Sequence, residues 1–281
     1  MVAVPAGSWD VHVHNFDPVG HPYIPDTRYN PPARSVNDLV ASVPSTNFVI
    51  VMSGPEGTDT ALTVEAMEQL RSMGRDARGM VVLDLEQMTP EELRRLDQAG
   101  VRGVRFNTRR EGFDLDKHYE AVAQRLHTAG VKWNVEAAIF DYLIWHSLIP
   151  TFRRLHEAYG TVFVADHVFA LDPKACDPEK LADILQLVDE GVLYVKISGL
   201  DRYSRRPEEL LPIIRDILSR RGGRGGLWGS DWPNVDSSHG STSLNDVDIE
   251  GHLALLKGVC DDLGNDTWEK LMASNAAELY A

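Results

Sequence analysis

Two histidines separated by one residue, His12 and His14, are the first residues whose types and spacing could support chemistry. They lie in the stretch 8–16, SWDVHVHNF, whose β-branched and aromatic residues favour a strand. Side chains alternate along a strand, so both imidazoles are expected on one face. Such a pair could bind a metal ion or polarise a carbonyl group. An isolated pair is equally compatible with two structural histidines, so its role depends on what else converges on it.

The elements that must position these histidines alternate regularly along the chain. Predicted strands cover 8–16, 47–53, 78–85, 101–107, 131–138, 161–168, 193–200 and 227–233. Predicted helices cover 59–73, 89–100, 114–129, 140–159, 178–190, 206–221, 246–263 and 266–273. With no change in composition to mark a linker, this alternation predicts an α/β fold, a (β/α)8 TIM barrel formed as a single domain by residues 1–281. An open doubly wound sheet is the alternative, but no G-x-G-x-x-G motif follows an early strand.

A long polar segment, 17–44, follows the first predicted strand. It contains several prolines together with Tyr23, Arg28 and Tyr29. Loops of this length are uncommon inside compact domains and are usually functional or disordered. Its aromatic residues and Arg28 favour a loop that folds over a site, while a simple surface excursion is the alternative.

Polar residues at the carboxyl ends of the strands carry the most information, because the chemistry of a TIM barrel lies there. Those we expect at these ends are His12, His14, Ser53, Arg105, Asn107, Asn134, Glu136, Asp166, His167, Lys196, Ser198, Ser230 and Asp231. Three imidazoles with a carboxylate and an arginine are typical of a hydrolytic site. A rim that only stabilised the barrel would consist mainly of Val, Ile and Leu.

Four motifs fall in order on the first, fourth, sixth and eighth predicted strands. They are DVHVH at 10–14, GVRGVRFN at 100–107, DHV at 166–168 and LWGSDWP at 227–233. This set resembles the amidohydrolase superfamily, and within it the branch of 2-pyrone-4,6-dicarboxylate lactonase and related sugar-lactone hydrolases. The ending SNAAELY at 274–280 is similar to the N-P-x-R-L-Y tail common there, with Ala276 where proline is usual. The resemblance covers nearly the whole chain.

The resemblance implies a role for each matched residue. Asp231 matches the aspartate that takes a proton from the attacking water, a role that suits an ionised carboxylate near imidazoles. His12, His14 and His167 match the histidines that polarise the scissile carbonyl and stabilise the oxyanion. The alternatives are a structural carboxylate that caps the following loop for Asp231, and a buried structural histidine for His167.

Metal binding is the point at which the sequence departs from part of the superfamily. Members that hold one metal generally use the H-x-H pair, a histidine on strand five and the aspartate of strand eight. The fifth predicted strand, 131–138, has no histidine. This departure favours metal-independent chemistry and no cofactor. Zinc remains the alternative, and its ligands would be His12, His14 and Asp231 with Glu136 or His167.

Substrate binding is expected to depend on cationic and polar residues around the same rim. The predicted set is Arg105, Arg202, Tyr29, Ser53, Asn107 and Asn134. Guanidinium groups bind carboxylates in a bidentate way, and Arg202 resembles the carboxylate-binding arginine of the family. Arg109 and Arg110 are either further contacts or solvated loop charges.

Two departures argue against the pyrone dicarboxylate itself as the substrate. The dicarboxylate lactonase has an arginine shortly after its sixth-strand D-H, where this chain has Phe-Ala-Leu at 169–171. Asn134 also stands where that lactonase has a tyrosine. We therefore expect one carboxylate clamp to be absent and the pocket to be more apolar.

Composition excludes several classes of partner. The chain has 281 residues, of which 43% are hydrophobic, and a formal net charge of −14. Nucleic acids and anionic membranes need a basic surface, so neither is an expected partner, and an anionic substrate must meet local arginines. No targeting signal or membrane-length apolar run is found, and Cys176 and Cys260 lack metal-binding spacing, so we expect a cytoplasmic protein with free thiols. No pattern indicates an oligomeric state.

These observations favour a hydrolase that opens a lactone or related cyclic ester of a small carboxylated, hydroxylated or aromatic ring compound. The partner is then a small anionic or cyclic ester substrate. A zinc-dependent decarboxylase of an aromatic or muconate-type acid is the second hypothesis. A non-catalytic ligand-binding barrel is the third, and the intact His and Asp set argues against it.

Overall fold

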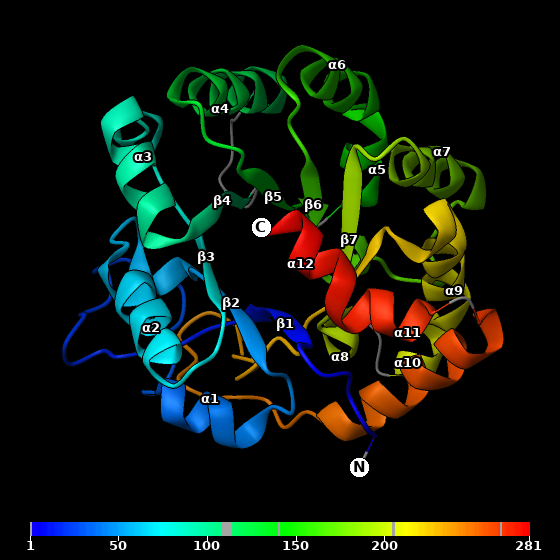
Figure 1. The fold of residues 1–281 in the computed structure, drawn as a ribbon, viewed down its shortest axis with the longest axis horizontal. Helices are drawn as coiled ribbons and strands as arrows, with labels where there is room; N and C mark the ends of the chain where they lie inside the picture. The colour runs from blue at the N-terminus through cyan, green and yellow to red at the C-terminus, as the bar shows by residue number, and fades with distance from the viewer. Residues whose placement is uncertain (1, 108–113, 140, 204–205, 265) are drawn as a thin grey trace.

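Eight parallel strands form the centre of the computed structural model, which describes residues 2–107, 114–139, 141–203, 206–264 and 266–281 (Figure 1). They are β1 (Trp9–Val13), β2 (Asn47–Val51), β3 (Ala77–Val81), β4 (Val101–Asn107), β5 (Asn134–Ala138), β6 (Phe163–Ala165), β7 (Leu193–Ile197) and β8 (Gly226–Trp228). Each strand pairs with the next in sequence. Val13 also pairs in parallel with Trp232, just beyond β8, and brings the two ends of the sheet together. The predicted TIM barrel is confirmed.

Helices surround the strands in a ring (Figure 1). They are α1 (Val36–Ser42), α2 (Ala61–Ser72), α3 (Pro90–Ala99), α4 (Leu115–Ala129), α5 (Tyr142–Ser147), α6 (Ile149–Tyr159), α7 (Pro178–Asp189), α8 (Leu200–Tyr203), α9 (Leu211–Ser219), α10 (Ile249–Leu263), α11 (Thr267–Glu269) and α12 (Asn275–Leu279). Helix α3 shows why the sequence folds in this way. The Thr89 side chain accepts a hydrogen bond from the Glu92 amide, and Gly100 ends the helix in the left-handed region at φ 105°.

The structure corrects the sequence-based helix assignments in several places. Helix α1 lies inside the segment 17–44, which was predicted to be a loop, and it begins with a capping box between Ser35 and Asp38. The predicted helix 140–159 is two helices, with proline in the first turn of α6, where its missing N–H is tolerated. Of the predicted helix 206–221, only α9 is α-helical, between two short 3-10 turns.

Strand β1 changes the face that it presents to the barrel. Its pairing with β2 shifts register between Asp10 and Val13. Val11 packs in the cluster inside the barrel, whereas Val13 packs in the outer cluster between strands and helices. Strict alternation would place these two valines on one face. The irregularity therefore acts as a β-bulge, which changes the side chains that face the barrel interior. As a result His12 follows Val11 toward the barrel interior, where it contacts Lys196 of β7.

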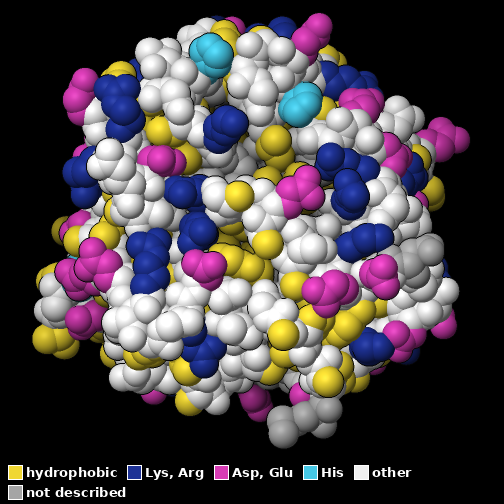
Figure 2. Space-filling model, viewed as in Figure 1, with side chains coloured by type: hydrophobic (Ala, Val, Ile, Leu, Met, Phe, Trp, Pro, Cys, Tyr) yellow, Lys and Arg dark blue, Asp and Glu magenta, His cyan; other side chains and the backbone are white. Residues whose placement is uncertain are grey.

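The last helix, α12, lies across the centre of the barrel in Figure 1. Ala276 and Tyr280 pack in the inner cluster with Trp9 at the start of β1. Arg78 Nε donates to the Tyr280 carbonyl at 2.8 Å, which fastens the chain end to β3. Basic and acidic side chains are interspersed over this face of the molecule (Figure 2). The amino end of the barrel is therefore covered, and the site must lie at the other end.

None of the helices within the described ranges combines the length and the hydropathy needed to cross a lipid bilayer.

Candidate active site

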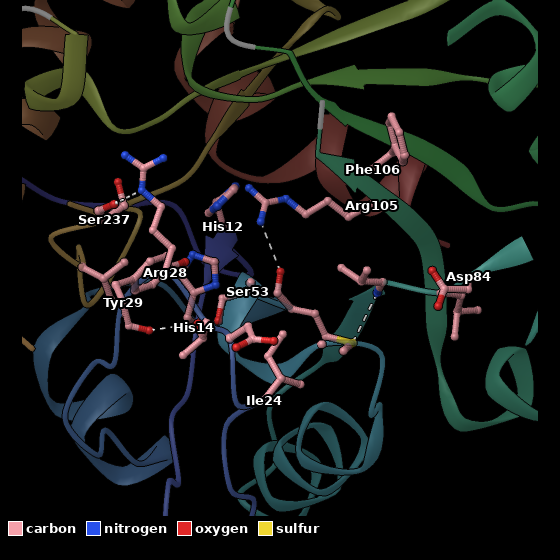
Figure 3. A pocket seen from close by; sticks show the side chains of 18 of the residues that line it. His12, His14, Ile24, Arg28, Tyr29, Ser53, Asp84, Arg105, Phe106 and Ser237 are labelled. Atoms are coloured by element: carbon pink, nitrogen blue, oxygen red, sulfur yellow. Dashed lines mark hydrogen bonds between the residues drawn. The ribbon is translucent and has the colours of Figure 1, made fainter. Parts of the chain in front are cut away.

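A cavity of about 740 Å³ lies at the carboxyl ends of the strands (Figure 3). Its volume falls in the range of small-molecule sites, about 300–1,000 Å³. Residues from β1, from the loop that follows it, from helix α4 and from the segments at or after the ends of β2, β3, β4, β6, β7 and β8 line it. They include His12, His14, Ile24, Asp26, Thr27, Arg28, Tyr29, Met52, Ser53, Val82, Leu83, Asp84, Leu85, Glu86, Arg105, Phe106, His118, His167, Arg202, Asp231, Val235 and Ser237.

His12, His14 and Asp231 meet in this cavity. Nε2 of His12 and Nε2 of His14 each lie 3.7 Å from Asp231 Oδ1. The side chains of His12 and Asp231 are almost completely buried. Neither His12 Nε2 nor Asp231 Oδ1 has a hydrogen-bond partner among the described residues. Because buried polar atoms are nearly always paired, these two atoms are available to hydrogen-bond a molecule that enters the cavity.

In each histidine the other ring nitrogen, Nδ1, makes a hydrogen bond, and these two bonds give the two rings different tautomers. His14 Nδ1 lies 2.6 Å from the Val51 carbonyl oxygen, which can only accept, so Nδ1 carries the proton. In the neutral ring of His14, Nε2 then carries the lone pair. Lys196 Nζ, which can only donate, lies 3.3 Å from His12 Nδ1. In His12 the proton is therefore on Nε2, which makes that atom a hydrogen-bond donor to the cavity.

Asp166 competes with Lys196 for His12 Nδ1. Asp166 Oδ1 lies 3.3 Å from this nitrogen, the same distance as Lys196 Nζ, but it falls outside good hydrogen-bond geometry. The geometry thus favours the bond from Lys196. Burial, together with the Lys196 ammonium, holds the pKa of His12 well below its usual value, so its ring is neutral at neutral pH.

Beneath His12, Lys196 belongs to a buried cluster of charges. Its ammonium is ion-paired with Glu136 and lies 3.6 Å from Asp166 Oδ1. Arg105 completes the cluster, with Nε 2.9 Å from Glu136 Oε1 and a terminal nitrogen 2.8 Å from Asp166 Oδ2. Burial acts to raise the pKa of Asp166, but Arg105, His12 and Lys196 hold it well below its usual value. Two carboxylates thus neutralise two cations under the cavity.

His167 is held by an unusual backbone. It begins a run of four residues with positive φ, His167 to Ala170, at 49°, 51°, 62° and 52°. Such conformations cost about 1–3 kcal/mol each and are concentrated at functional sites. The ring Nδ1 lies 2.9 Å from the Ser198 hydroxyl, and burial lowers the pKa of His167 to about 4. A Cβ on Gly199 would approach His167 Nδ1 to 2.7 Å, so glycine is required beside this ring.

Asp231 is also held in the left-handed region, at φ 63°. Its Oδ2 is ion-paired with Arg202 Nε and accepts a hydrogen bond from Asn234 Nδ2 at 3.0 Å. Burial acts to raise the pKa of Asp231, but the Arg202 guanidinium and the neighbouring imidazoles of His167, His14 and His12 hold it well below its usual value. The carboxylate is therefore ionised at neutral pH, with Oδ2 fixed in place and Oδ1 directed at the two histidines.

Ser53 caps the short turn Gly54–Glu56 after β2. Glu56 Oε2 accepts hydrogen bonds from the Ser53 amide at 2.7 Å and from its hydroxyl at 2.8 Å. Burial raises the pKa of Glu56 from 4.5 to about 7, although the bonds from Ser53 and the charge of Arg105 oppose the change. The S-x-x-E spacing of Ser53 and Glu56 is a capping motif, and this pattern could have indicated the position of the carboxyl group from the sequence.

This raised pKa predicts a pH-dependent effect of Glu56→Gln. A carboxyl group whose pKa is higher in the folded state contributes stability below pH 4.5, and that stability is lost as the pH rises through about 7. At about 1.4 kcal/mol per pKa unit, the wild type should lose up to about 3 kcal/mol relative to the variant between pH 5 and pH 8.5. Urea unfolding at both values measures this. Glu68→Gln, a substitution at an exposed residue, should show no such trend. If the free energies of unfolding of the wild type and Glu56→Gln change equally between the two pH values, the raised pKa of Glu56 is contradicted.

Residues of the loop after β1, from Ile24 to Tyr29, line the cavity. Tyr29 lies near Arg105 and Arg202, and a hydrogen bond joins it to the Gly54 backbone. Arg28 Nε donates to the Ser237 carbonyl at 3.0 Å, and the Asn30 amide donates to the Ser241 carbonyl at 2.8 Å. These bonds fasten the loop to the segment that follows β8, and Figure 3 shows the one between Arg28 and Ser237.

Most of the predicted site residues come together in the cavity. His12, His14, His167, Asp231, Arg105, Arg202, Tyr29 and Ser53 all line it. Glu136 lies in the buried cluster beneath them. Arg109 and Arg110 lie outside the described residues, as does the side chain of Asn107. Glu56, Asp84 and His118 were not among the site residues predicted from the sequence; Asp84 and His118 also line the cavity.

Asn134 is the predicted site residue that the structure places elsewhere. It is the first residue of β5, so it lies toward the amino end of the strand instead of the carboxyl end. Its Nδ2 donates to the Arg102 carbonyl at 3.0 Å, and it is not among the cavity-lining residues. The predicted strand began three residues earlier than β5 does, and this put Asn134 too far along the strand.

The cysteines are free thiols, as expected: Cys176 is half-buried and Cys260 is buried, and neither forms a disulfide.

The donor atoms in the cavity include a group that fits a divalent metal ion. One ligand atom each from His12, His167 and Asp231 lie within 4.8 Å of one another. A second group, His12, Glu136 and Asp166, meets the same limit, but Lys196 and Arg105 are ion-paired with its carboxylates. Two imidazoles and a carboxylate match the ligands that zinc uses in catalytic sites.

The chain is similar to known proteins over most of its length. The chain is 28% identical over 295 residues to a 2-pyrone-4,6-dicarboxylate hydrolase from Comamonas testosteroni, across 99% of this chain and 91% of that protein. It is 27% identical over 265 residues to a 4-sulfomuconolactone hydrolase from Hydrogenophaga intermedia, across 88% and 81% of the two chains. The crystal structure of a probable 2-pyrone-4,6-dicarboxylic acid hydrolase from Acinetobacter baumannii, with citric acid bound, superposes with a TM-score of 0.77. That pair is 22% identical and covers 98% of this chain and 99% of the other.

The sequence profile described as Amidohydrolase matches residues 9–281, which includes every strand of the barrel and every side chain of the site. The chain therefore belongs to the amidohydrolase family.

Proposed function

We propose that this protein hydrolyses a lactone or related cyclic ester of a small carboxylated, hydroxylated or aromatic ring compound. The observation that carries the proposal is the position of Asp231 Oδ1, 3.7 Å from Nε2 of both His12 and His14 in the buried floor of the cavity. Relatives named for the hydrolysis of a pyrone dicarboxylate and a sulfomuconolactone support an ester-hydrolysing enzyme.

In the proposed mechanism the attacking water lies between Asp231 Oδ1 and His14 Nε2. Both atoms accept hydrogen bonds in the states described above, so the water directs a lone pair at the ester carbonyl. Asp231 takes the proton as the water attacks, which is general base catalysis. This role for His14 differs from the carbonyl-polarising role expected from the sequence, because its Nδ1 proton is committed to Val51.

His12 supplies a hydrogen bond to the developing oxyanion. Its Nε2 carries the proton when Lys196 donates to Nδ1, and fixed donors of this kind stabilise charge that develops in the transition state. His167 lies beside it, with ring centroids 4.6 Å apart, and contributes to the same stabilisation. Collapse of the tetrahedral intermediate breaks the ring C–O bond, and the departing alkoxide receives the proton held by Asp231.

The substrate's anionic group is proposed to bind near Arg28 and Tyr29. Arg105 is ion-paired with Glu136 and Asp166, and Arg202 is ion-paired with Asp231, so both predicted carboxylate-binding residues already neutralise protein carboxylates. Arg28 contacts a backbone carbonyl and forms no ion pair with any carboxylate of the described chain. Guanidinium groups bind carboxylates in a bidentate way.

A metal ion is not part of this mechanism, although the donors fit one. His12, His167 and Asp231 would hold it, and when bound it would polarise the carbonyl as a Lewis acid. The same donors would serve a zinc-dependent decarboxylase of an aromatic or muconate-type acid, which is the second candidate function. Elemental analysis of purified protein and activity after chelation separate the two: stoichiometric zinc and complete loss of activity on its removal would favour the decarboxylase or a metal-assisted hydrolase.

A weakly buffered pH-indicator assay tests the proposed reaction. Ester hydrolysis to a carboxylate releases a proton, whereas decarboxylation consumes one. We therefore expect acidification with lactones and no alkalinisation with aromatic acids. Alkalinisation with an aromatic acid and no reaction with any lactone would replace the proposal with the second candidate.

A further inference from the structure

A tight turn after β8 returns the chain onto the proposed base. The Asn234 amide donates to the Asp231 carbonyl at 2.7 Å. Asp231 and Asn234 have φ values of 63° and 54°, in the left-handed region that aspartate and asparagine tolerate better than most residues. The turn places Asn234 Nδ2 3.0 Å from Asp231 Oδ2. Asn234 is 4% exposed and is not among the residues that line the cavity, so it acts on the reaction only through the groups that it contacts.

A second asparagine fixes the orientation of the first. The two ends of an asparagine amide have nearly the same shape, but only the nitrogen end donates hydrogen bonds. A carboxylate oxygen can only accept, so Asn234 turns Nδ2 toward Asp231 and Oδ1 away from it. Asn245 Nδ2 donates to that Oδ1 at 2.9 Å. A half-turn of the Asn234 amide would break both bonds, so Asn245 holds Asn234 in the orientation that donates to Asp231.

Backbone pairing fixes the position of Asn245. Its amide donates to the Asn234 carbonyl at 2.8 Å, and the residues next to this pair, Val235 and Leu244, form an antiparallel bridge. The segment 234–245 is thus a hairpin, with the two asparagines facing each other at its base. A substitution that shortens the Asn245 side chain leaves these backbone bonds in place, so it tests the side chain alone.

The Asp231 carboxylate needs more than one donor to hold its orientation. The terminal torsion of an aspartate is soft, with broad minima. Arg202 Nε is ion-paired with Oδ2, and Asn234 adds a hydrogen bond to the same oxygen. The two groups come from different segments, one after β7 and one after β8, so together they restrict rotation more than either does. Oδ1 is thereby held 3.7 Å from Nε2 of both His12 and His14.

We propose that Asn234 and Asn245 are positioning residues for Asp231, and that their two side-chain hydrogen bonds keep Oδ1 directed at the attacking water. The proposal rests on the proposed function, because it takes Asp231 as the general base. Displacement of a reacting group by about 1 Å lowers a rate by about 10²-fold. Neither asparagine is among the cavity-lining residues, so their loss should lower kcat and leave KM nearly unchanged.

Two substitutions at Asn234 separate positioning from a structural role in the turn. The substrate is the lactone that the wild type hydrolyses fastest in the pH-indicator assay. Asn234→Gly still tolerates positive φ but removes the donor, and should lower kcat about 10-fold. Asn234→Asp keeps the shape but sets a second negative charge against Asp231, and should lower kcat about 100-fold. KM should change less than about 2-fold in both.

Glycine satisfies the backbone of the turn, so a role in the turn alone predicts wild-type kcat for Asn234→Gly. Thermal unfolding shows that the variant is folded. Wild-type kcat in folded Asn234→Gly would overturn the proposal.

A double-mutant cycle tests whether Asn245 acts through Asn234. Asn245→Ala should lower kcat about 3- to 10-fold in the wild type and have no further effect in Asn234→Gly, because residues that act through one another are not additive. Thr242→Ala, at an exposed residue of the same hairpin, is the control and should keep wild-type kcat. Equal effects of Asn245→Ala in the two backgrounds would show that it acts on the hairpin and would overturn its positioning role.

NMR without a substrate separates this proposal from the proposed function. The carboxyl ¹³C resonance of Asp231, assigned by its loss in Asp231→Asn, and the side-chain amide resonances of Asn234 should both shift in Asn245→Ala. If no lactone is hydrolysed but these shifts occur, the proposed function fails and the two asparagines still hold Asp231. If a lactone is hydrolysed but neither resonance shifts, the proposal fails and the proposed function stands.

Discussion

Asp231→Asn should lower kcat by about 10²- to 10⁴-fold, the usual contribution of a general base, and leave the protein folded. The asparagine side chain can still accept a hydrogen bond from Arg202, and it occupies the same volume, but it cannot take a proton from water. Because the wild-type pKa of Asp231 is held well below its usual value, protonation of Asp231 should not limit wild-type activity between pH 6 and 9. Steady-state kinetics over this pH range measure both effects, and thermal unfolding reports on the fold.

The matched control is Asp236→Asn, which removes a carboxylate that is close in sequence but does not line the cavity. It should retain near wild-type turnover. Near-normal kcat in folded Asp231→Asn would remove Asp231 from the mechanism and with it the assignment of the site.

Lys196→Met should lower kcat by about 10²- to 10³-fold, the effect of losing one oxyanion donor. Without the ammonium, His12 Nδ1 is expected to donate to Asp166 Oδ1, 3.3 Å away, and Nε2 then loses its proton. Removal of one partner from a buried ion pair also destabilises a protein by about 3–5 kcal/mol. Kinetics, urea unfolding and the ¹⁵N chemical shifts of the His12 ring measure the three consequences separately.

A second variant shows whether the lower kcat comes from a changed tautomer of His12 or only from a loss of stability. Lys196→Met combined with Glu136→Gln removes one positive and one negative charge, so the fold should recover while the donor to His12 stays absent. We expect stability to return toward that of Glu136→Gln alone, with kcat still low and Nε2 unprotonated. If the double variant regains full activity, or if the ¹⁵N shifts match the wild type, then Lys196 has no positioning role.

The sequence predicted the parts of the fold that depend on local patterns. All eight strands lie within a few residues of their predicted ranges, because buried parallel strands are short apolar runs between turn residues. His12, His14, His167 and Asp231 were found because each lies at the carboxyl end of a strand, and such ends meet at one mouth of a barrel. Position along a strand was therefore enough to bring these four residues together.

The remaining features depend on contacts between distant residues. The proton on His12 Nε2 follows from Lys196, which lies 184 residues away in sequence. The pairing of Arg105 and Arg202 with protein carboxylates likewise follows from three-dimensional packing. The sequence alone does not show whether an arginine binds a substrate or an aspartate of the protein. Helix α1 was missed because its seven residues show too short a periodic pattern among the surrounding prolines.

The bulge in β1 separates one short strand into two parts that should tolerate different substitutions. Residues before it, such as Val11, are buried for packing, so their substitutions should be tolerated according to volume. Residues after it, His12 and His14, hold protons at fixed positions, so no substitution of similar size preserves what they do. Insertion or deletion of a single residue between the two parts would turn the histidines out of the barrel while leaving the core largely intact. Loss of activity could thus arise in evolution in one step, with a folded barrel left to acquire another use.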